Sequence, residues 1–269
     1  MKLAVVVGAN GFLGSKIVNE LINRNIEVLA VYNSHSENIN KCATLITNDQ
    51  LLGSDSKPDF IYYATGNYTK SHEDLLKINL TLYKYSIKFT NSKFLYISST
   101  NVYGIHNNAI TENSTYNNPG IYALSKLSGE FIVSAMPNYS IARLTYIYGP
   151  GITNSSFIPQ IVKSAKDSGQ IMLNGNGNRM QDYIYIDDAV AFCIASALSK
   201  NNGIYLGATG KSISNIEVAE EIKKWIECSI QYSGEDSGKS FFFDPQKTNK
   251  ELNWLPKISI SEGIKKMLK

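Results

Sequence analysis

The sequence predicts an α/β fold with a doubly wound parallel sheet and a smaller, discontinuous C-terminal lobe. Short apolar runs alternate with amphipathic stretches of helical length, which is the pattern of repeated βαβ units. Most of the runs are apolar throughout, as expected of parallel strands that helices cover on both faces. A glycine-rich turn directly follows the first run, and such a turn between a strand and a helix is typical of this fold class.

The elements follow from these runs in chain order. The expected strands are Leu3–Val7, Glu27–Tyr32, Phe60–Ala64, Phe94–Ser98, Ile141–Tyr146 and Ile204–Leu206. The helices expected around them, from their apolar periodicity, are Phe12–Asn23, His72–Phe89, Tyr122–Ala135, Ile158–Lys166, Asp188–Leu198 and Asn215–Glu227.

The domain boundaries are expected where this alternation loosens, after about Pro150. We expect residues 1–149 and 183–210 to form the dinucleotide-binding domain, with 183–208 returning to the main sheet. Residues 150–182 and 211–269 are expected to form the smaller, substrate-binding lobe. In this architecture ligands bind at the carboxyl ends of the parallel strands, where the strand order reverses.

Composition excludes several other classes of protein. Of the 269 residues 43% are hydrophobic, which is enough for a sizeable core. The net charge of +3 is too small to indicate a nucleic-acid partner, and no apolar run approaches the ~18 residues of a membrane span. Cys42, Cys193 and Cys228 are scattered, so we expect a reducing, cytoplasmic setting with neither a disulfide framework nor a thiolate metal site.

The glycine turn is the first candidate site. Its spacing is G-x-x-G-x-x-G, a relative of the dinucleotide fingerprint. Glycine permits the tight turn and a close approach of the backbone to a pyrophosphate, and the helix that follows offers free N–H groups to the phosphates. The residues expected to contact the cofactor here are Gly8, Asn10, Gly11, Phe12, Leu13 and Gly14.

The loop after the second strand bears on the choice of cofactor. A carboxylate in this position usually binds the adenosine ribose, but the segment Val31–Ser36 contains none. Asn33, Ser34 and His35 could instead donate hydrogen bonds to a 2′-phosphate. This favours NADP over NAD, although NAD stays open because the loop contains no Arg.

A Ser–Tyr–Lys set is the candidate catalytic centre. Ser99 follows a buried strand, and Tyr122 and Lys126 share one helix face at spacing i, i+4. A nearby ammonium favours the phenolate, so Tyr122 could exchange a proton with a carbonyl or alcohol oxygen while hydride moves to or from a nicotinamide. Ser99 would hydrogen-bond the same oxygen. No pattern of metal ligands accompanies these residues.

At these residues the chain resembles the extended short-chain dehydrogenase/reductase superfamily, in its nucleotide-sugar epimerase/dehydratase branch. The similarity covers nearly the whole length and includes the glycine motif, Ile97–Gly104, the Tyr122/Lys126 pair and Arg143–Gly151. It continues through Gly175–Asp188 and the tail Asp244–Pro256. Two helices, His72–Phe89 and Tyr122–Ala135, could form the dimer face common in this family or could simply cover the sheet.

The resemblance implies a Rossmann domain that binds NAD(P) and a C-terminal lobe that binds a nucleoside-diphosphate sugar. It implies that Tyr122 is the acid/base, that Lys126 binds the nicotinamide ribose and lowers the pKa of Tyr122, and that Ser99 orients the sugar oxygen. It adds Ala64, Thr65, Tyr146 and Ile147 as cofactor contacts, and Thr100, Tyr146, Arg179 and Gln181 as substrate contacts.

Departures from the family pattern narrow the reaction. Sugar 4,6-dehydratases carry carboxylates directly after the catalytic Ser or Thr, whereas this chain has Thr100 and Asn101, which disfavours dehydration. The missing acid after the second strand suits a reductase that exchanges NADPH. We therefore expect a 4-ketoreductase of a nucleotide-linked keto-sugar; a 4-epimerase, or a catalytically idle cofactor sensor or scaffold, remains an alternative.

The expected diphosphate contact also departs from the family. Gln181 stands where the family commonly has an Arg, and Arg179 lies two residues earlier. Residues i and i+2 share a face in an extended segment, so Arg179 could take the place of the missing cation.

Overall fold

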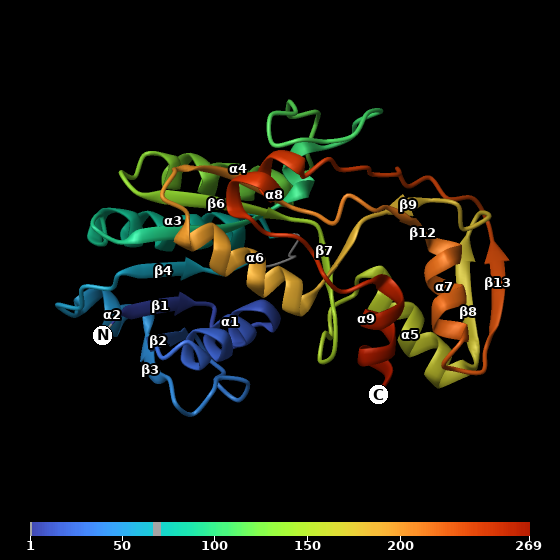
Figure 1. Ribbon diagram of the computed structural model, residues 1–269, viewed down its shortest axis with the longest axis horizontal. Coiled ribbons are helices and arrows are strands. Elements are labelled where there is room, and N and C mark those ends of the chain that lie inside the picture. The colour runs from blue at the N-terminus through green and yellow to red at the C-terminus, as the bar shows by residue number, and fades with distance from the viewer. Residues whose placement is uncertain (1, 67–70) are drawn as a thin grey trace.

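The computed structural model describes residues 2–66 and 71–269, and its centre is a parallel sheet of seven strands in the order β11-β6-β5-β4-β1-β2-β3 (Figure 1). The order reverses between β1 and β4, which are hydrogen-bonded neighbours, so the switch point of the doubly wound fold lies at their carboxyl ends. These strands are β1 Leu3–Val7, β2 Glu27–Tyr32, β3 Thr44–Thr47, β4 Phe60–Tyr63, β5 Lys93–Ser99, β6 Tyr139–Leu144 and β11 Gly203–Gly207.

Helices cover both faces of this sheet (Figure 1). Successive residues of a strand point to opposite faces, so Ala4 and Val6 of β1 pack in one core cluster while Val5 and Val7 pack in the other. Helices α1 and α6 contact each other on the first face, and α3 and α4 contact each other on the second. The helices of this domain are α1 Phe12–Asn23, α2 Asn48–Gly53, α3 His72–Lys88, α4 Ile121–Ser134 and α6 Ile186–Leu198.

The smaller lobe lies at the carboxyl side of the sheet (Figure 1). Its strands pair in short ribbons, β8 with β13 in parallel and β9 with β12 antiparallel. A third ribbon, β7 with β10, lies where the chain passes between the two parts. These elements are β7 Tyr146–Tyr148, α5 Phe157–Ser168, β8 Gln170–Asn174, β9 Met180–Gln181, β10 Tyr183–Tyr185, β12 Ile213–Ser214, α7 Asn215–Lys223, β13 Ser229–Ser233 and α9 Ile260–Leu268.

Two further short helices belong to the large domain. The 3-10 helix η1, Thr100–Tyr103, continues from the end of β5, and α8, Gln246–Leu252, contacts the edge strand β11. No described helix has the length and apolar character needed to cross a membrane.

The structure confirms the expected fold class and corrects some boundaries. The expected strand Ile141–Tyr146 ends instead at Leu144, because Tyr146 pairs with β10. Thr145, between the two strands, donates its N–H to the Gly207 carbonyl at 3.1 Å and its hydroxyl to the Asp182 carbonyl at 2.7 Å. Residues 183–208 return to the main sheet only through Gly203–Gly207, since Tyr183–Tyr185 pairs with β7. The expected helix Asn215–Glu227 ends at Lys223.

Candidate active site

The glycine turn is a tight bend with no space for side chains at Gly8 and Gly14. Gly8 has φ +82°, and the Gly11 N–H donates to the Gly8 carbonyl at 3.0 Å. A Cβ on Gly14 would collide with that same carbonyl. Gly11 begins α1 without any side-chain cap, so the N–H groups of the first turn are left for a ligand.

The loop after β2 is tied to this turn. Asn10 accepts a hydrogen bond from the Asn38 backbone N–H at 2.8 Å, and its own carbonyl accepts from the Asn38 amide at 3.3 Å. Asn33 and Ser34 are exposed in this loop. Directly after Ser36, Glu37 places its Oε1 3.2 Å from His35 Nδ1. The loop therefore holds a carboxylate, paired with a histidine.

Lys126 is the most constrained group of the candidate catalytic set. The residue is 6% exposed, and its ammonium donates to the carbonyls of Thr65 at 2.8 Å and Ile97 at 3.0 Å. Burial lowers its pKa to about 8, and the negative charge of Glu130 opposes this shift. Helix α4 is thereby joined to the ends of both β4 and β5, so Lys126 has one fixed position.

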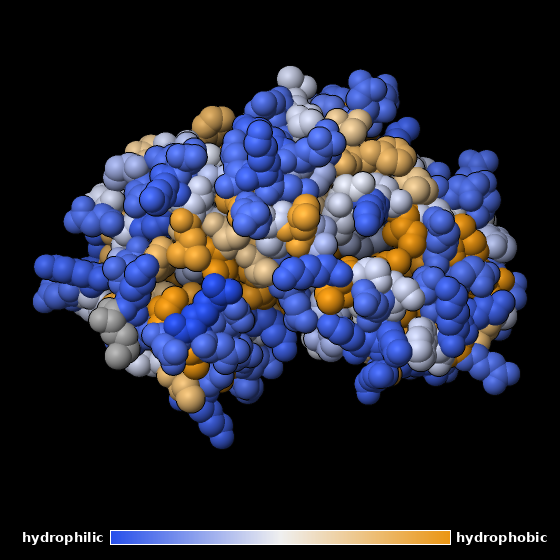
Figure 2. Space-filling model, in the orientation of Figure 1, coloured by the Kyte–Doolittle hydropathy of each residue, from blue (hydrophilic) through white to orange (hydrophobic). Residues whose placement is uncertain are grey.

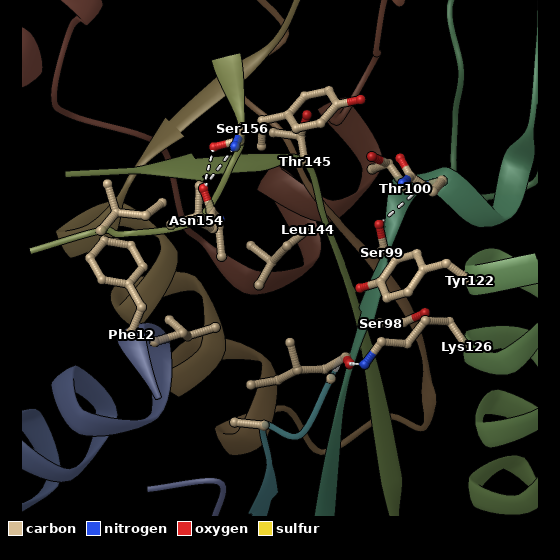
Figure 3. Close-up of a pocket in the computed structure, with 18 of the residues that line it drawn as sticks. Phe12, Ser98, Ser99, Thr100, Tyr122, Lys126, Leu144, Thr145, Asn154 and Ser156 are labelled. Atoms are coloured by element: carbon tan, nitrogen blue, oxygen red, sulfur yellow. Dashed lines mark hydrogen bonds between the residues drawn. The ribbon is translucent and has the colours of Figure 1, made fainter. Parts of the chain in front are cut away.

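Tyr122 lies beside this ammonium. A Cβ placed on Gly66 would lie 3.2 Å from Lys126 Nζ and 3.9 Å from the Tyr122 hydroxyl, so the three groups surround one small volume. Figure 3 shows the Tyr122 hydroxyl directed into the cavity, between Ser99 above and the ammonium below. The Ser99 hydroxyl accepts from the Asn101 N–H at 3.2 Å and starts η1.

These side chains form one wall of a cavity of about 570 Å³. Phe12 and Asn154 lie on the wall that faces them (Figure 3). Among the described residues that line the cavity there is no Asp, Glu or His, so Tyr122, Lys126 and Tyr146 are its titratable groups. This described lining can exchange a proton through Tyr122 but contains no carboxylic acid or imidazole for a further acid–base step.

The structure brings most of the predicted site residues together and leaves a few outside. The predicted residues that line the cavity are Phe12, Leu13, Ala64, Thr65, Ser99, Thr100, Tyr122, Lys126, Tyr146 and Ile147. The glycines of the turn, Asn10, Asn33 and Ser34 lie outside this lining.

The two residues predicted for the diphosphate have other partners. Arg179 places its Nε 3.4 Å from Asp236 Oδ2, and Gln181 donates its amide to the Lys239 carbonyl at 3.0 Å. Neither belongs to the described lining of the cavity.

Sequence reasoning missed several polar residues at or behind the walls, among them Glu130, Asn154 and Ser156. Glu130 accepts from the Ser98 hydroxyl at 2.5 Å behind the catalytic wall. Asn154 accepts from the Ser156 N–H at 3.1 Å on the facing wall. Glu130 stands four residues after Lys126 on the same helix face, which is a signal that could have indicated it. Asn154 and Ser156 lie in an irregular loop that carries no such signal.

Comparison with known proteins agrees with this geometry. The model of the NAD dependent epimerase/dehydratase family matches residues 4–206. The UDP-glucuronic acid decarboxylase 1 of Arabidopsis thaliana is 27% identical, over 98% of this chain and 68% of that protein.

Solved structures show the same fold. The dTDP-glucose 4,6-dehydratase of Bacillus anthracis, in complex with NAD, has a TM-score of 0.88 at 18% identity, covering 100% of this chain and 96% of the other. The UDP-glucose 4-epimerase of Thermotoga maritima, with UDP-glucose, has a TM-score of 0.84 at 20% identity, covering 99% and 97%. With the glycine turn and the Ser–Tyr–Lys wall in place, the match over most of its length shows that this chain belongs to the NAD dependent epimerase/dehydratase family.

Proposed function

We propose that this chain reduces the 4-keto group of a nucleoside-diphosphate keto-sugar, with a reduced nicotinamide dinucleotide as the hydride donor. The observation that carries the proposal is the described cavity lining, which has Ser99, Tyr122 and Lys126 but no carboxylate or imidazole. Such a lining suits a reaction that moves one proton and one hydride. It does not suit an elimination, which needs a further acid and base.

The residues present fit a dinucleotide. Gly8 and Gly14 let the turn pack closely against its neighbours, and the uncapped start of α1 would hold a pyrophosphate with its free N–H groups. Phe12 and Leu13, at that start, line the same cavity as Tyr122, so a ligand held by the turn can reach the catalytic wall. When bound, the dinucleotide would supply the hydride; the proton chemistry belongs to the chain.

The catalytic wall would supply the proton. The Ser99 hydroxyl would donate to the carbonyl oxygen of the substrate and polarise it. Tyr122 would give its phenolic proton to the same oxygen as the carbonyl carbon gains the hydride, so that the carbonyl becomes an alcohol. The ammonium of Lys126 would stabilise the phenolate that remains. A proton from solvent then restores the phenol.

A 4-epimerase is the second candidate, because it uses the same single proton carrier and therefore the same lining. The two differ in what happens to the cofactor: a reductase consumes it in proportion to product, whereas an epimerase regenerates it in each turnover. The described lining contains no carboxylate, and this disfavours a third reaction, 4,6-dehydration.

For the cofactor we propose NADPH rather than NADH. The exposed Asn33 and Ser34 follow β2 with neutral donors, where a carboxylate would repel a 2′-phosphate. The carboxylate of Glu37 lies farther along the loop and is engaged with His35. The sugar nucleotide would bind in the lobe formed by residues 150–182 and 211–269. There the guanidinium of Arg179, which is paired with Asp236, would contact the diphosphate.

The reaction is tested by following NADPH absorbance with nucleotide-linked 4-keto-sugars. Tyr122→Phe is expected to lower kcat by about 10²- to 10⁴-fold while the cofactor still binds. Tyr232→Phe removes the hydroxyl of an exposed tyrosine on β13 and is the matched control, with wild-type kcat. Product formed without net NADPH oxidation would favour the epimerase. Cofactor binding without turnover of any candidate would favour the idle sensor.

We also propose that the chain forms a homodimer through α3 and α4. Large apolar side chains stand exposed along both helices: Leu76, Leu80 and Ile87 on α3, and Leu124 and Phe131 on α4. The face on the α1 and α6 side, shown in Figure 2, is mainly hydrophilic with apolar side chains in small separate groups. A row of apolar side chains on two adjacent helices is typical of a self-complementary interface.

A further inference from the structure

A buried ion pair lies directly behind the catalytic wall. Glu130 is 4% and Arg143 1% exposed. Arg143 Nε donates to Glu130 Oε1 at 2.9 Å and its Nη2 donates to Oε2 at 2.6 Å, so the guanidinium grips the carboxylate at two points. Removing both charges from water costs about as much as their attraction returns, so stability alone does not account for this pair.

The carboxylate joins the two elements that carry the catalytic side chains. Ser98 and Arg143 are register partners on β5 and β6, so their side chains point to the same face of the sheet. Both meet Glu130, which the Ser98 hydroxyl approaches at 2.5 Å. Glu130 lies one helical turn beyond Lys126 on α4, and Ser98 directly precedes Ser99. One carboxylate therefore holds the end of β5 against α4.

Arg143 is itself held from the opposite side. Its Nη2 donates to the Tyr116 hydroxyl at 2.8 Å, and its guanidinium carbon lies 4.6 Å from the ring centroid of Tyr103 and 5.3 Å from that of Tyr116. These aromatic rings come from η1 and the loop that follows it. Together with the hydrogen bond to Tyr116, they fix the orientation of the Arg143 guanidinium.

The surroundings of Lys126 make the charge of Glu130 important. One described neighbour is Tyr96, whose ring centroid lies 5.2 Å from Nζ, with the Tyr63 ring tilted against it at 6.2 Å between centroids. The others are Tyr122, Glu130, and Arg143, which is paired with Glu130. Burial raises the pKa of Tyr63 to about 12 and holds that of Tyr96 well above its usual value, so both are neutral at pH 7. Glu130 is thus the negative charge of this set.

We propose that the Glu130–Arg143 pair positions the catalytic wall: Glu130 keeps the buried Lys126 in its ammonium form and ties the end of β5 to α4, while Arg143 holds the carboxylate in place and limits its charge. This inference rests on the proposed function, because the groups positioned are Ser99, Tyr122 and Lys126. Glu130 and Arg143 are positioning residues and touch no substrate.

The pH profile of kcat/KM gives a readout that a purely structural role would not move. Activity needs the ammonium of Lys126, whose pKa of about 8 should set the alkaline limb of the profile. Glu130→Gln removes the stabilising charge and should move this limb down by about 1 pH unit. Arg143→Gln removes the positive charge that offsets Glu130, so the alkaline limb should move to higher pH. Equal loss of activity at every pH, without opposite shifts, would overturn the proposal.

A double variant guards against loss of folding in the single ones. Glu130→Gln/Arg143→Met removes both charges and keeps the side-chain volume, so it should fold. Its alkaline limb should lie below that of the wild type, because the charge of Glu130 acts on Lys126 directly, whereas Arg143 acts through its pairing with Glu130. A wild-type profile in this variant would overturn the proposal. Glu20→Gln, which breaks an exposed pair with Arg24, is the control and should change nothing.

A measurement without turnover separates this inference from the proposed reaction. The pH titration of the Lys126 ε-carbon can be followed by NMR in lysine-labelled protein, with the signal assigned by its loss in Lys126→Arg. The same opposite shifts in Glu130→Gln and Arg143→Gln would support the positioning role. If the wild type reduced no keto-sugar but these shifts appeared, the proposed reaction would be contradicted and the positioning role of the Glu130–Arg143 pair would still be supported. Unshifted titrations would contradict the role itself.

Discussion

Lys126 donates a hydrogen bond from its buried ammonium to the backbone carbonyl of Thr65 at 2.8 Å, and this bond joins the catalytic helix to the segment that leaves β4. It also leaves little room beside Thr65. The next residue, Gly66, faces both the ammonium and the Tyr122 hydroxyl, so the absence of a side chain there keeps the catalytic wall open.

Gly66→Ala should therefore damage catalysis more than stability. The new methyl would lie 3.2 Å from Lys126 Nζ, and Lys126 cannot move without breaking two hydrogen bonds. We expect kcat to fall about 10- to 100-fold, since sub-ångström displacements of catalytic groups are costly. The free energy of unfolding should change by less than about 1 kcal/mol. Gly53→Ala, where a Cβ would meet nothing within 4 Å, is the control; equal kinetics in both variants would contradict this reading.

Ser34→Asp should reverse the preference for the cofactor. A carboxylate beside the exposed end of β2 would repel a 2′-phosphate and accept hydrogen bonds from ribose hydroxyls. We expect NADPH to bind at least tenfold more weakly, about 1.4 kcal/mol, and NADH to bind more tightly. Fluorescence titration of both cofactors measures this. Gln231→Glu adds the same charge at an exposed position of β13 and should leave both affinities unchanged; unaltered affinities in Ser34→Asp would place the ribose elsewhere.

The ion pair between Arg179 and Asp236 should set the affinity for the sugar nucleotide. If Arg179 binds the diphosphate, Arg179→Gln should raise KM about tenfold with little change in kcat, because uniform binding is lost. Asp236→Asn should lower KM, since the carboxylate 3.4 Å from Arg179 Nε competes with the phosphates. Steady-state kinetics of both variants measure the two effects. Equal KM values in wild type and Arg179→Gln would exclude this residue from the substrate site.

Charges placed on the α3/α4 surface should produce monomers. Leu80 is 62% and Phe131 68% exposed, so Leu80→Glu and Phe131→Glu should fold normally but carry a charge into the proposed interface. Sedimentation analysis is expected to show dimers for the wild type and monomers for each variant. Leu255→Glu changes an equally exposed leucine outside these helices and should stay dimeric. A monomeric wild type would contradict the proposal directly.

Sequence patterns predicted the elements that bury a continuous apolar run or stripe. The strands Leu3–Val7 and Glu27–Tyr32 and the helix Phe12–Asn23 were predicted at their observed ends, because each has an uninterrupted apolar run or stripe. The edge strand Thr44–Thr47 was missed, since it is largely exposed and has no such run. The break at Thr145 was missed as well, because it depends on the pairing of Tyr146 with β10, a partner distant in sequence.

The candidate site divides in the same way. Ser99, Tyr122 and Lys126 could be named from spacing along one strand end and one helix. Two ion pairs, Glu130 with Arg143 behind these residues and Asp236 with Arg179 outside the cavity lining, form only through the fold, across 13 and 57 residues of chain. Local periodicity contains no information about such pairs.

The carboxylate-free cavity has a consequence for the configuration of the product. If Tyr122 on one wall is the proton carrier, the described lining has no carboxylate or imidazole on the facing wall with which to favour one epimer. The configuration of the product then depends on which face of the hexose ring lies toward the cofactor. The smaller lobe sets this orientation by binding the nucleotide. A sugar seated after a half-rotation would yield the opposite alcohol from the same catalytic residues, so changes in the lobe alone could invert the outcome.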